Sequence, residues 1–389
     1  MATSTIGRVP NTAQPRRIAL VTSSFAPHVG GVEEHVRHVG RELMTRGHSL
    51  EVWTVDRGEH LGQRLVDGLT VHYLPTPLPA RSTRALLSYA AQAPSAWMQW
   101  VRVQRAFRPE ILHVQCFGPN GLYALALHRI FRTPLVVSSH GETIADDHAV
   151  FDESALLRSG LRSALTRATA TTGCSQFVLD HLADNYGLRG GVVVPNGVDL
   201  DMSPGTPETP APYVFAVGRL GKQKGFDLLL SAYATSSLPK QGVRLIIGGD
   251  GPERMALEDQ RRRLGLDPMV VLPGRLSADE VAAGMAGAVA VAVPSRVEAF
   301  GIVALEAWRS GSPLIMSSRG GGPDLVRDGI DGILVDPMDT VSLACTLDRM
   351  QADGALGARL ARAGRSRVSQ FTWEATAAAY NDMYSTIGR

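Results

Sequence analysis

The chain has 389 residues, with 39 Lys and Arg against 37 Asp and Glu, so its formal net charge is only +2. Apolar residues make up 44% of it and charged residues 20%, which excludes a disordered chain and argues against a general nucleic-acid binder with a large cationic surface. Glycine is in excess at 40 residues, and aromatic residues are only 6%. A chain of this size and composition indicates parallel α/β structure with many tight strand-to-helix turns.

Short apolar and β-branched runs recur along the chain, each followed by a turn and a helical pattern. Several are apolar throughout, as in strands buried on both faces, and their alternation with helices predicts parallel sheets. In the first half the predicted strands are Ile18–Thr22, Leu50–Val55, Val71–Leu74, Ile111–Gln115, Leu135–Ser139, Ala168–Thr172 and Val192–Val194. In the second half they are Tyr213–Val217, Arg244–Ile247, Val270–Leu272, Val289–Val293, Leu314–Met316 and Ile333–Val335.

A proline-rich stretch without apolar periodicity, Asp201–Pro212, separates the two sets of strands. We therefore predict two Rossmann-like, doubly wound domains, residues 16–203 and 213–370, joined by a linker at 204–212 and facing a cleft. Residues 371–389 are predicted to form a docking helix with an aromatic face. Ligands of such sheets bind beyond the carboxyl ends of the strands, so a ligand in the cleft would meet both domains.

The sequence also favours a cytoplasmic location. Its three cysteines, Cys116, Cys174 and Cys345, are far apart and odd in number, which argues against a disulfide framework or a zinc site. No apolar run approaches the roughly 18 residues of a membrane span. Residues 1–15 lack the apolar core of a signal peptide, and we expect them to be a disordered lead-in.

Two glutamates lie near the start of a largely apolar predicted helix that begins close to Gly301. Glu298 would lie in the turn before the helix and Glu306 two turns inside it. A carboxylate buried there is costly unless its oxygens accept strong hydrogen bonds, such as those of a ribose diol. Glu298 could accept from a second sugar, and the amides at 300–302 would face negative charge. Alternatively, Glu306 pairs with Arg309.

Glycine turns follow other predicted strands. Gly218 and Arg219 begin a turn that continues to Lys224, and its two cations could clamp a diphosphate or form an exposed basic turn. Gly30 and Gly31 would admit a ligand near backbone amides. Neither these turns nor the one from 248 to 251 matches the dinucleotide fingerprint, so a nicotinamide cofactor is not expected.

His140 and Glu142 follow the strand Leu135–Ser139, again at a carboxyl end. A histidine there is either structural or a ligand-binding group. The sequence contains no Ser/His/Asp order, no nucleophile elbow and no metal-ligand cluster.

Taken together, the motifs resemble glycosyltransferase family 4, retaining sugar-nucleotide-dependent transferases with the GT-B fold. The resemblance covers about residues 16 to 385, and its elements follow the family's order. They are Gly30–Glu33, Val194–Asp199, Val217–Gly225, Gly248–Pro252, Glu298–Glu306 with the family's Glu-x7-Glu spacing, and Gly320–Asp324.

The resemblance implies a role for each matched residue. Arg219 and Lys224 would hold the donor diphosphate, Glu306 the ribose, and Glu298 the donor hexose, while His140 would contact the sugar near the reacting centre. The implied catalytic residues are His140, Arg219, Lys224 and Glu298. The implied donor-binding residues are Gly30, Gly31, Gly218, Arg219, Lys224, Gly249, Arg275, Leu276, Glu298, Phe300, Gly301, Ile302 and Glu306, with Arg275 and Leu276 beside the base and Gly31 near the diphosphate or acceptor.

The C-terminal helix would cross back onto the first domain. The chain departs from the family's pattern at Asp324, where Glu is usual, and at Ala307–Arg309, where small residues are usual; both could mark a modified pocket wall.

The expected reaction is hexosyl transfer by front-face attack without a metal or cofactor, from a UDP-sugar first and a GDP-sugar second. The alternatives are a sugar-nucleotide 2-epimerase on the same fold and a non-catalytic nucleotide-sugar-binding subunit. The acceptor is unknown, with Glu33 and Glu142 as candidate contacts, and we expect a monomer or a weak homodimer.

Arginines and apolar residues alternate between Arg81 and Arg108, including Arg84, Arg102, Trp97 and Met98. This pattern fits either peripheral binding to an anionic membrane or an exposed basic face over a buried aromatic side.

Overall fold

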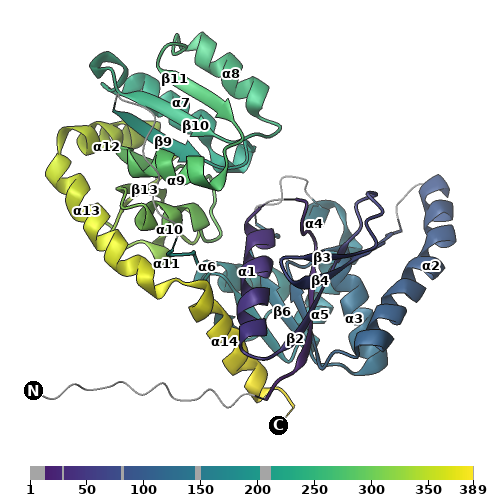
Figure 1. Ribbon diagram of the computed structural model, residues 1–389. Coiled ribbons are helices and arrows are strands. Elements are labelled where there is room, and N and C mark those ends of the chain that lie inside the picture. The colour runs from purple at the N-terminus through teal and green to yellow at the C-terminus, as the bar shows by residue number, and fades with distance from the viewer. Residues whose placement is uncertain (1–13, 29, 80–82, 145–149, 202–211, 389) are drawn as a thin grey trace, which may run out of the picture.

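The computed structural model describes residues 14–28, 30–79, 83–144, 150–201 and 212–388, without the side chains of 83–85. Figure 1 shows two α/β domains, with the C-terminal helices running along both. The predicted pair of doubly wound sheets is confirmed, with one antiparallel strand in the first. Residues 1–13 and most of the predicted linker lie outside the described residues.

The first sheet has eight strands in the order β3-β4-β2-β1-β5-β6-β7-β8. Every neighbouring pair is parallel except β3 with β4. The strands are β1 (Arg17–Thr22), β2 (Ser49–Val55), β3 (Gln63–Val66), β4 (Leu69–Leu74), β5 (Ile111–Gln115), β6 (Leu135–Ser139), β7 (Ala170–Gly173) and β8 (Val192–Val193). The helices are α1 (Gly31–Thr45), α2 (Thr83–Phe107), α3 (Pro119–Phe131), α4 (Val150–Glu153), α5 (Ala155–Arg167) and α6 (Gln176–Tyr186).

The second sheet has six parallel strands in the order β11-β10-β9-β12-β13-β14. The strands are β9 (Tyr213–Val217), β10 (Arg244–Gly248), β11 (Val270–Gly274), β12 (Ala290–Val293), β13 (Leu314–Ser317) and β14 (Ile333–Val335). The helices are α7 (Phe226–Thr235), α8 (Arg254–Arg263), α9 (Ala278–Ala286), α10 (Ile302–Arg309), α11 (Gly322–Leu325), α12 (Thr340–Ala352), α13 (Gly354–Arg367) and α14 (Trp373–Thr386), with short 3₁₀ turns at Lys222–Lys224, Pro239–Gln241 and Val368–Gln370.

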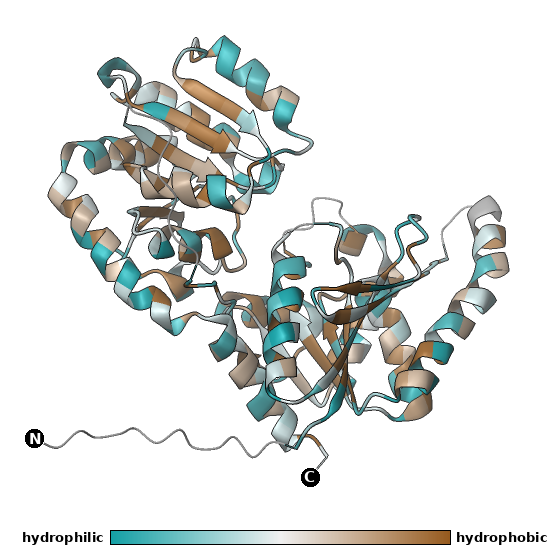
Figure 2. Ribbon diagram, in the orientation of Figure 1, coloured by the Kyte–Doolittle hydropathy of each residue, from teal (hydrophilic) through white to brown (hydrophobic). Residues whose placement is uncertain are grey.

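Alternation along β1 builds the two cores of the first domain. Ile18 and Leu20 belong to the cluster with α1 and α14, whereas Ala19 and Val21 belong to the cluster with α3 and α5, because successive side chains of a strand point to opposite faces. All four are fully buried, and Figure 2 shows the central strands of both sheets in hydrophobic brown. Burial on both faces explains why these strands are mostly apolar.

Helix α14 returns to the first domain and packs against α1, as Figure 1 shows at the lower left of that domain. Thr372 caps its first turn by accepting from the amide of Ala375. The aromatic side chains Trp373, Tyr380 and Tyr384 are buried against the first domain. The last helix therefore joins both domains.

Candidate functional site

The predicted donor-binding residues of the second domain lie at the carboxyl ends of four neighbouring strands. Since β9 stands between β10 and β12, the chain runs outward from β9 in both directions, and such a switch point is where open α/β sheets bind ligands. Gly218 and Arg219 follow β9, Gly249 follows β10, Arg275 and Leu276 follow β11, and the segment from Glu298 to Glu306 follows β12.

Two of these turns are packed so closely that only glycine fits. Gly249 has φ +129°, and a Cβ added to it would lie 1.9 Å from the carbonyl oxygen of Gly218. Gly225 has φ +66°, and an added Cβ would lie 2.1 Å from the oxygen of Pro294. The glycines thus bring the turn after β9 against the turns after β10 and β12.

Lys224 and Glu298 meet at the centre of this arrangement. Lys224 Nζ lies 2.9 Å from Glu298 Oε2, which also accepts a 2.7 Å hydrogen bond from Ser295 Oγ. Burial would raise the pKa of the Glu298 carboxyl, but the Lys224 ammonium and these hydrogen bonds outweigh it, so the pKa is lowered. Glu298 therefore remains ionised at neutral pH beside a cation.

A second ion pair holds the two turns together, and sequence reasoning missed it. The two terminal guanidinium nitrogens of Arg296 donate to the carboxylate of Asp227, at 2.7 and 2.6 Å. The amide of Arg296 also donates to the oxygen of Gln223 at 2.8 Å. This paired geometry fixes the Glu298 turn against the Lys224 turn. The sequence signal that could have pointed to this ion pair is Asp227, an acidic residue in the first turn of α7.

Glu306 lies partly buried on α10. Burial raises the pKa of its carboxyl, with Arg309 acting against the shift and Glu34 of the first domain adding to it. Glu306 forms no ion pair within the described part of the chain. Arg309 instead donates to the oxygen of Asp199 at 3.1 Å. The alternative Glu306–Arg309 pair is thus an electrostatic influence without a direct contact.

The two domains touch beside this site. An added Cβ on Gly31 would lie 3.5 Å from Ile302 Cδ1, and one on Gly141 would lie 2.3 Å from Ala299 Cβ. Ser175 Oγ donates to the oxygen of Ala299 at 2.6 Å. We call these five residues the interdomain junction. It brings the start of α1 and the end of β6 next to the Glu298–Ile302 segment.

His140 lies in this junction region, one residue before Gly141. Its Nε2 is 2.8 Å from Gln115 Oε1, and its ring stands edge-on to that of His35 with centroids 4.4 Å apart. Burial, with a smaller contribution from His113, lowers the pKa of His140 to about 3. The imidazole is therefore neutral at physiological pH.

The two candidate acceptor contacts, Glu142 and Glu33, both belong to the first domain. Glu142 accepts from the amide of Phe117, the hydroxyl of Ser139 and the amide of His140, each at 2.8 Å. Burial nevertheless raises its pKa. Glu33 folds back over the start of α1, where a Cβ on Gly30 would lie 2.7 Å from its Oε2. Their roles toward an acceptor stay predictions.

The departures from the family's pattern serve packing between elements. Asp324 Oδ2 accepts a 2.9 Å hydrogen bond from the amide of Phe177 at the start of α6. Trp308 is fully buried, donates to the oxygen of Asp331 at 2.7 Å and lies against Gly364 of α13. These contacts join helices and domains, and a modified pocket wall at these positions stays a prediction.

Within the described ranges, no three His, Cys, Asp or Glu side chains are grouped as a metal site would require. Among the same residues, no helix combines the length and the apolar character that crossing a membrane requires.

Comparison with known proteins identifies the family. The Glycosyltransferase Family 4 model matches residues 29–202, and the model for glycosyl transferases group 1 matches residues 198–367. Glycogen synthase of Mycobacterium tuberculosis is 28% identical, covering 96% of this chain and 95% of that protein. D-inositol 3-phosphate glycosyltransferase of Segniliparus rotundus is also 28% identical, covering 96% and 90%.

Among solved structures, sucrose-phosphate synthase from Thermosynechococcus elongatus aligns with a TM-score of 0.79 at 23% identity, covering 95% of this chain and 98% of that one. The order of the motifs, the paired sheets and the two adjoining family matches agree, and the protein belongs to glycosyltransferase family 4 and has the GT-B fold.

Proposed function

We propose that this glycosyltransferase moves a hexose from a nucleoside-diphosphate donor to an acceptor hydroxyl with retention of configuration. The acceptor oxygen forms a bond to the anomeric carbon on the face from which the diphosphate leaves. The bond from that carbon to the diphosphate breaks, its electron pair goes to the departing oxygen, and the acceptor proton follows. The observation that carries the proposal is the Lys224–Glu298 pair at the carboxyl ends of β9 and β12.

Catalysis would be mainly electrostatic. Negative charge grows on the diphosphate as it leaves, and fixed cations and amides stabilise it without reorganisation. Arg219 and Lys224 would supply the cations, and the amides of Phe300, Gly301 and Ile302 the donors. Glu298 would hold the hexose and keep Lys224 in place. No step requires a metal, and we expect turnover to persist in a chelator.

The donor and acceptor classes are candidates to be tested. We propose UDP-hexoses as the first donors to test and GDP-hexoses as the second. The names of the two relatives point to glucans and to phosphorylated inositols as acceptors to try.

A donor panel tests the proposal. Released nucleoside diphosphate is measured with and without each acceptor, and the anomeric configuration of the product is read by NMR. We expect acceptor-dependent release and a product with the donor's configuration. An inverted product would overturn the retaining mechanism. Epimerised sugar nucleotide formed without acceptor would support the 2-epimerase, and donor binding without turnover the non-catalytic subunit.

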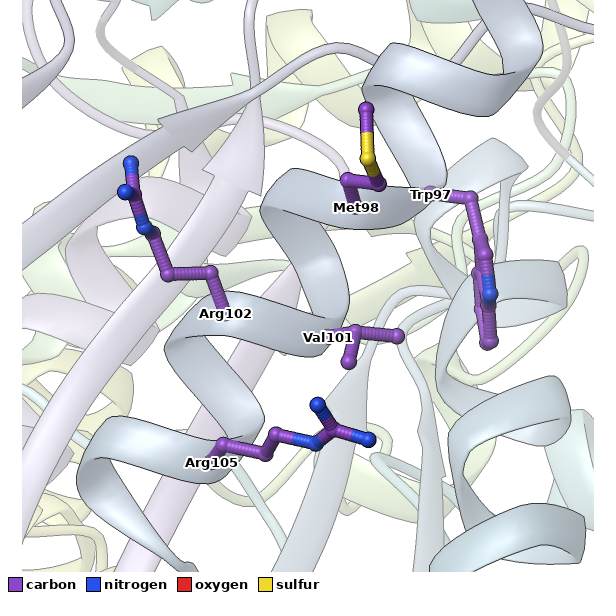
Figure 3. A pocket seen from close by; sticks show the side chains of 5 residues that line it. All are labelled: Trp97, Met98, Val101, Arg102 and Arg105. Carbon is purple, nitrogen blue, oxygen red and sulfur yellow. The ribbon is translucent and has the colours of Figure 1, made fainter.

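We further propose that α2 binds an anionic membrane surface. The segment from Thr83 to Phe107 contains no Asp or Glu, and Arg102 and Arg105 are exposed. Leu87 is 73% and Met98 64% exposed. Together with Trp97, Val101 and Met98, these arginines line a pocket of about 410 Å³, and Figure 3 shows all five side chains on successive turns of α2. Arg81 and the side chain of Arg84 lie outside the described residues.

Basic and apolar side chains on one exposed helix complement lipid phosphates and acyl chains. A double reversal, Arg102→Glu with Arg105→Glu, should weaken sedimentation with anionic vesicles by more than tenfold, given about 1 kcal/mol per cation near such a surface. Arg263→Glu on α8 is the control, because it reverses an exposed cation on a helix that also carries Glu258 and Asp259. Equal binding to neutral vesicles, or none to anionic ones at low salt, would remove the membrane proposal.

A further inference from the structure

The side chain of Gln115 contacts that of His140. Gln115 is the last residue of β5, is fully buried and is paired in the sheet with Ser138 of β6. Its Oε1 is 2.8 Å from His140 Nε2, and its Nε2 is 3.2 Å from His113 Nε2. The side-chain amide therefore lies between the buried His113 imidazole and the partly buried His140 imidazole.

The amide oxygen determines which ring nitrogen of His140 carries the proton. An amide oxygen only accepts hydrogen bonds, so a 2.8 Å contact requires His140 Nε2 to be the donor. In a neutral imidazole the other nitrogen is then unprotonated and can accept. His140 Nδ1 thus becomes an acceptor, the state needed to receive a hydroxyl of a sugar.

Gln115 belongs to a buried polar network that extends to α14. His113 Nδ1 is 2.5 Å from the hydroxyl of Tyr384, and its Nε2 is 2.6 Å from Ser138 Oγ. Ser138 Oγ is also 2.6 Å from Thr172 Oγ1 and 3.4 Å from the hydroxyl of Tyr380. Tyr380 and Tyr384 of α14, the helix that joins the domains, therefore belong to the same polar network as Gln115.

The same network also reaches His140 through His35. The Tyr380 hydroxyl is 3.2 Å from His35 Nε2, and His35 Nδ1 is 2.7 Å from Asn196 Oδ1. The His35 ring in turn packs against that of His140. His140 is consequently held from β5, α1 and, through the tyrosines, α14.

We propose that Gln115 is a positioning residue that holds His140 in the Nε2-protonated form, with Nδ1 free to accept from the donor sugar. The inference rests on the proposed function for its catalytic consequence. The tautomer itself is a property of the protein alone and can be measured without substrate, so the two can fail separately.

Burial and the neighbouring imidazoles favour a neutral His140 ring. The titratable groups next to it are His35 from α1, His113 from β5 and Glu142 from the same turn, and Tyr380 from α14 contacts His35. Burial lowers the pKa of both His35 and His113, so neither brings a charge at neutral pH. Glu142 is engaged by two amides and a hydroxyl and contacts the backbone of His140, not its ring.

The first experiment is ¹⁵N NMR of the full chain with labelled histidine, with the His140 signals assigned by their loss in His140→Gln. We expect a neutral ring protonated at Nε2 and unchanged from pH 5 to 8. A ring protonated at Nδ1, or one that titrates in that range, would overturn the proposal whatever the enzyme's activity.

The second experiment compares two variants kinetically. Gln115→Leu removes the acceptor, and kcat should fall about tenfold to a hundredfold, by analogy with the partners that orient metal-ligating histidines, with the donor KM within about twofold. Gln115→Glu keeps an acceptor but stabilises the imidazolium, so activity should fall as pH drops through the raised pKa of His140.

Gln104→Leu is the matched control. Gln104 is also a buried glutamine of the first domain, but it lies on α2, away from the junction. Its side chain donates to Thr133 Oγ1 at 3.1 Å. It should lose stability without a change in the pH profile or in kcat. If Gln115→Leu folds and keeps the wild-type tautomer and kcat, Gln115 is only structural. If it does not fold, the wild-type NMR measurement and Gln115→Glu still decide.

Discussion

Lys224 Nζ contacts Glu298 Oε2 at 2.9 Å, although 74 positions separate the two residues in the chain. The lysine comes from the turn after β9 and the glutamate from the turn after β12, two neighbouring strands. The Glu298 side chain is 10% exposed, whereas that of Lys224 is 37% exposed. The pair thus joins a buried anion to a more accessible cation, and the contact holds the ammonium at the ends of these strands.

Removal of this cation should affect the chemical step. Lys224→Ala should lower kcat by roughly 10²–10³-fold, the range for losing one group that stabilises developing charge. Steady-state kinetics with the best donor measures the effect. Lys222→Ala, in the same turn and exposed, should stay near wild type. Near-normal turnover in Lys224→Ala would remove it from the diphosphate clamp.

The lowered pKa of Glu298 makes a stability prediction with a defined sign. A carboxylate whose pKa is lower folded than unfolded stabilises the protein above its ordinary pKa of 4.5, and this contribution is lost as pH falls through the lower value. Wild type should therefore exceed Glu298→Gln in free energy of unfolding at pH 7, with the gap shrinking below pH 4.5. Urea titrations at several pH values measure it; a gap independent of pH would contradict the ion-pair interpretation.

Glu306 should behave in the opposite way. Its pKa is raised by burial, so its ionised form costs stability as pH rises from the unfolded to the folded pKa. Glu306→Gln should unfold at a higher urea concentration than wild type at pH 7 and at the same one at pH 4. Because a charged acceptor is lost, donor affinity should fall about tenfold to a hundredfold. Calorimetric titration checks the affinity; unchanged binding would exclude a ribose contact.

The bond between Asp324 and the start of α6 joins the two domains. Asp324→Ala should cost about 1 kcal/mol in free energy of unfolding, the usual effect of losing an acceptor at a helix N-terminus. Asp324→Asn is the control, since it keeps an acceptor oxygen and should lose less. If the two variants lose the same free energy of unfolding relative to wild type, the hydrogen bond contributes nothing and the loss is due to the charge alone.

Much of the fold could be predicted because buried parallel strands are apolar throughout. β9 and β12 follow this pattern fully, and β1 and β5 follow it except at Arg17 and Thr22 and at His113 and Gln115. The sequence analysis missed β3, whose residues Gln63–Val66 are mostly exposed and pair only with β4 at the sheet edge. A strand that pairs with one neighbour and is exposed to solvent lacks a strong hydrophobic periodicity, so its sequence does not predict it.

By themselves, the glycine and charge motifs and their order determined the resemblance to the family and the positions of the turns, because each motif is local in the chain. Only the tertiary structure decided which groups meet. Contacts such as Lys224 with Glu298, Arg296 with Asp227, and Gln115 with His140 join separate strand ends. All three depend on strand order, and the contact of Lys224 with Glu298 depends also on the close approach of the two turns that Gly225 permits. Strand order follows from the packing of whole layers, which no single segment of sequence contains.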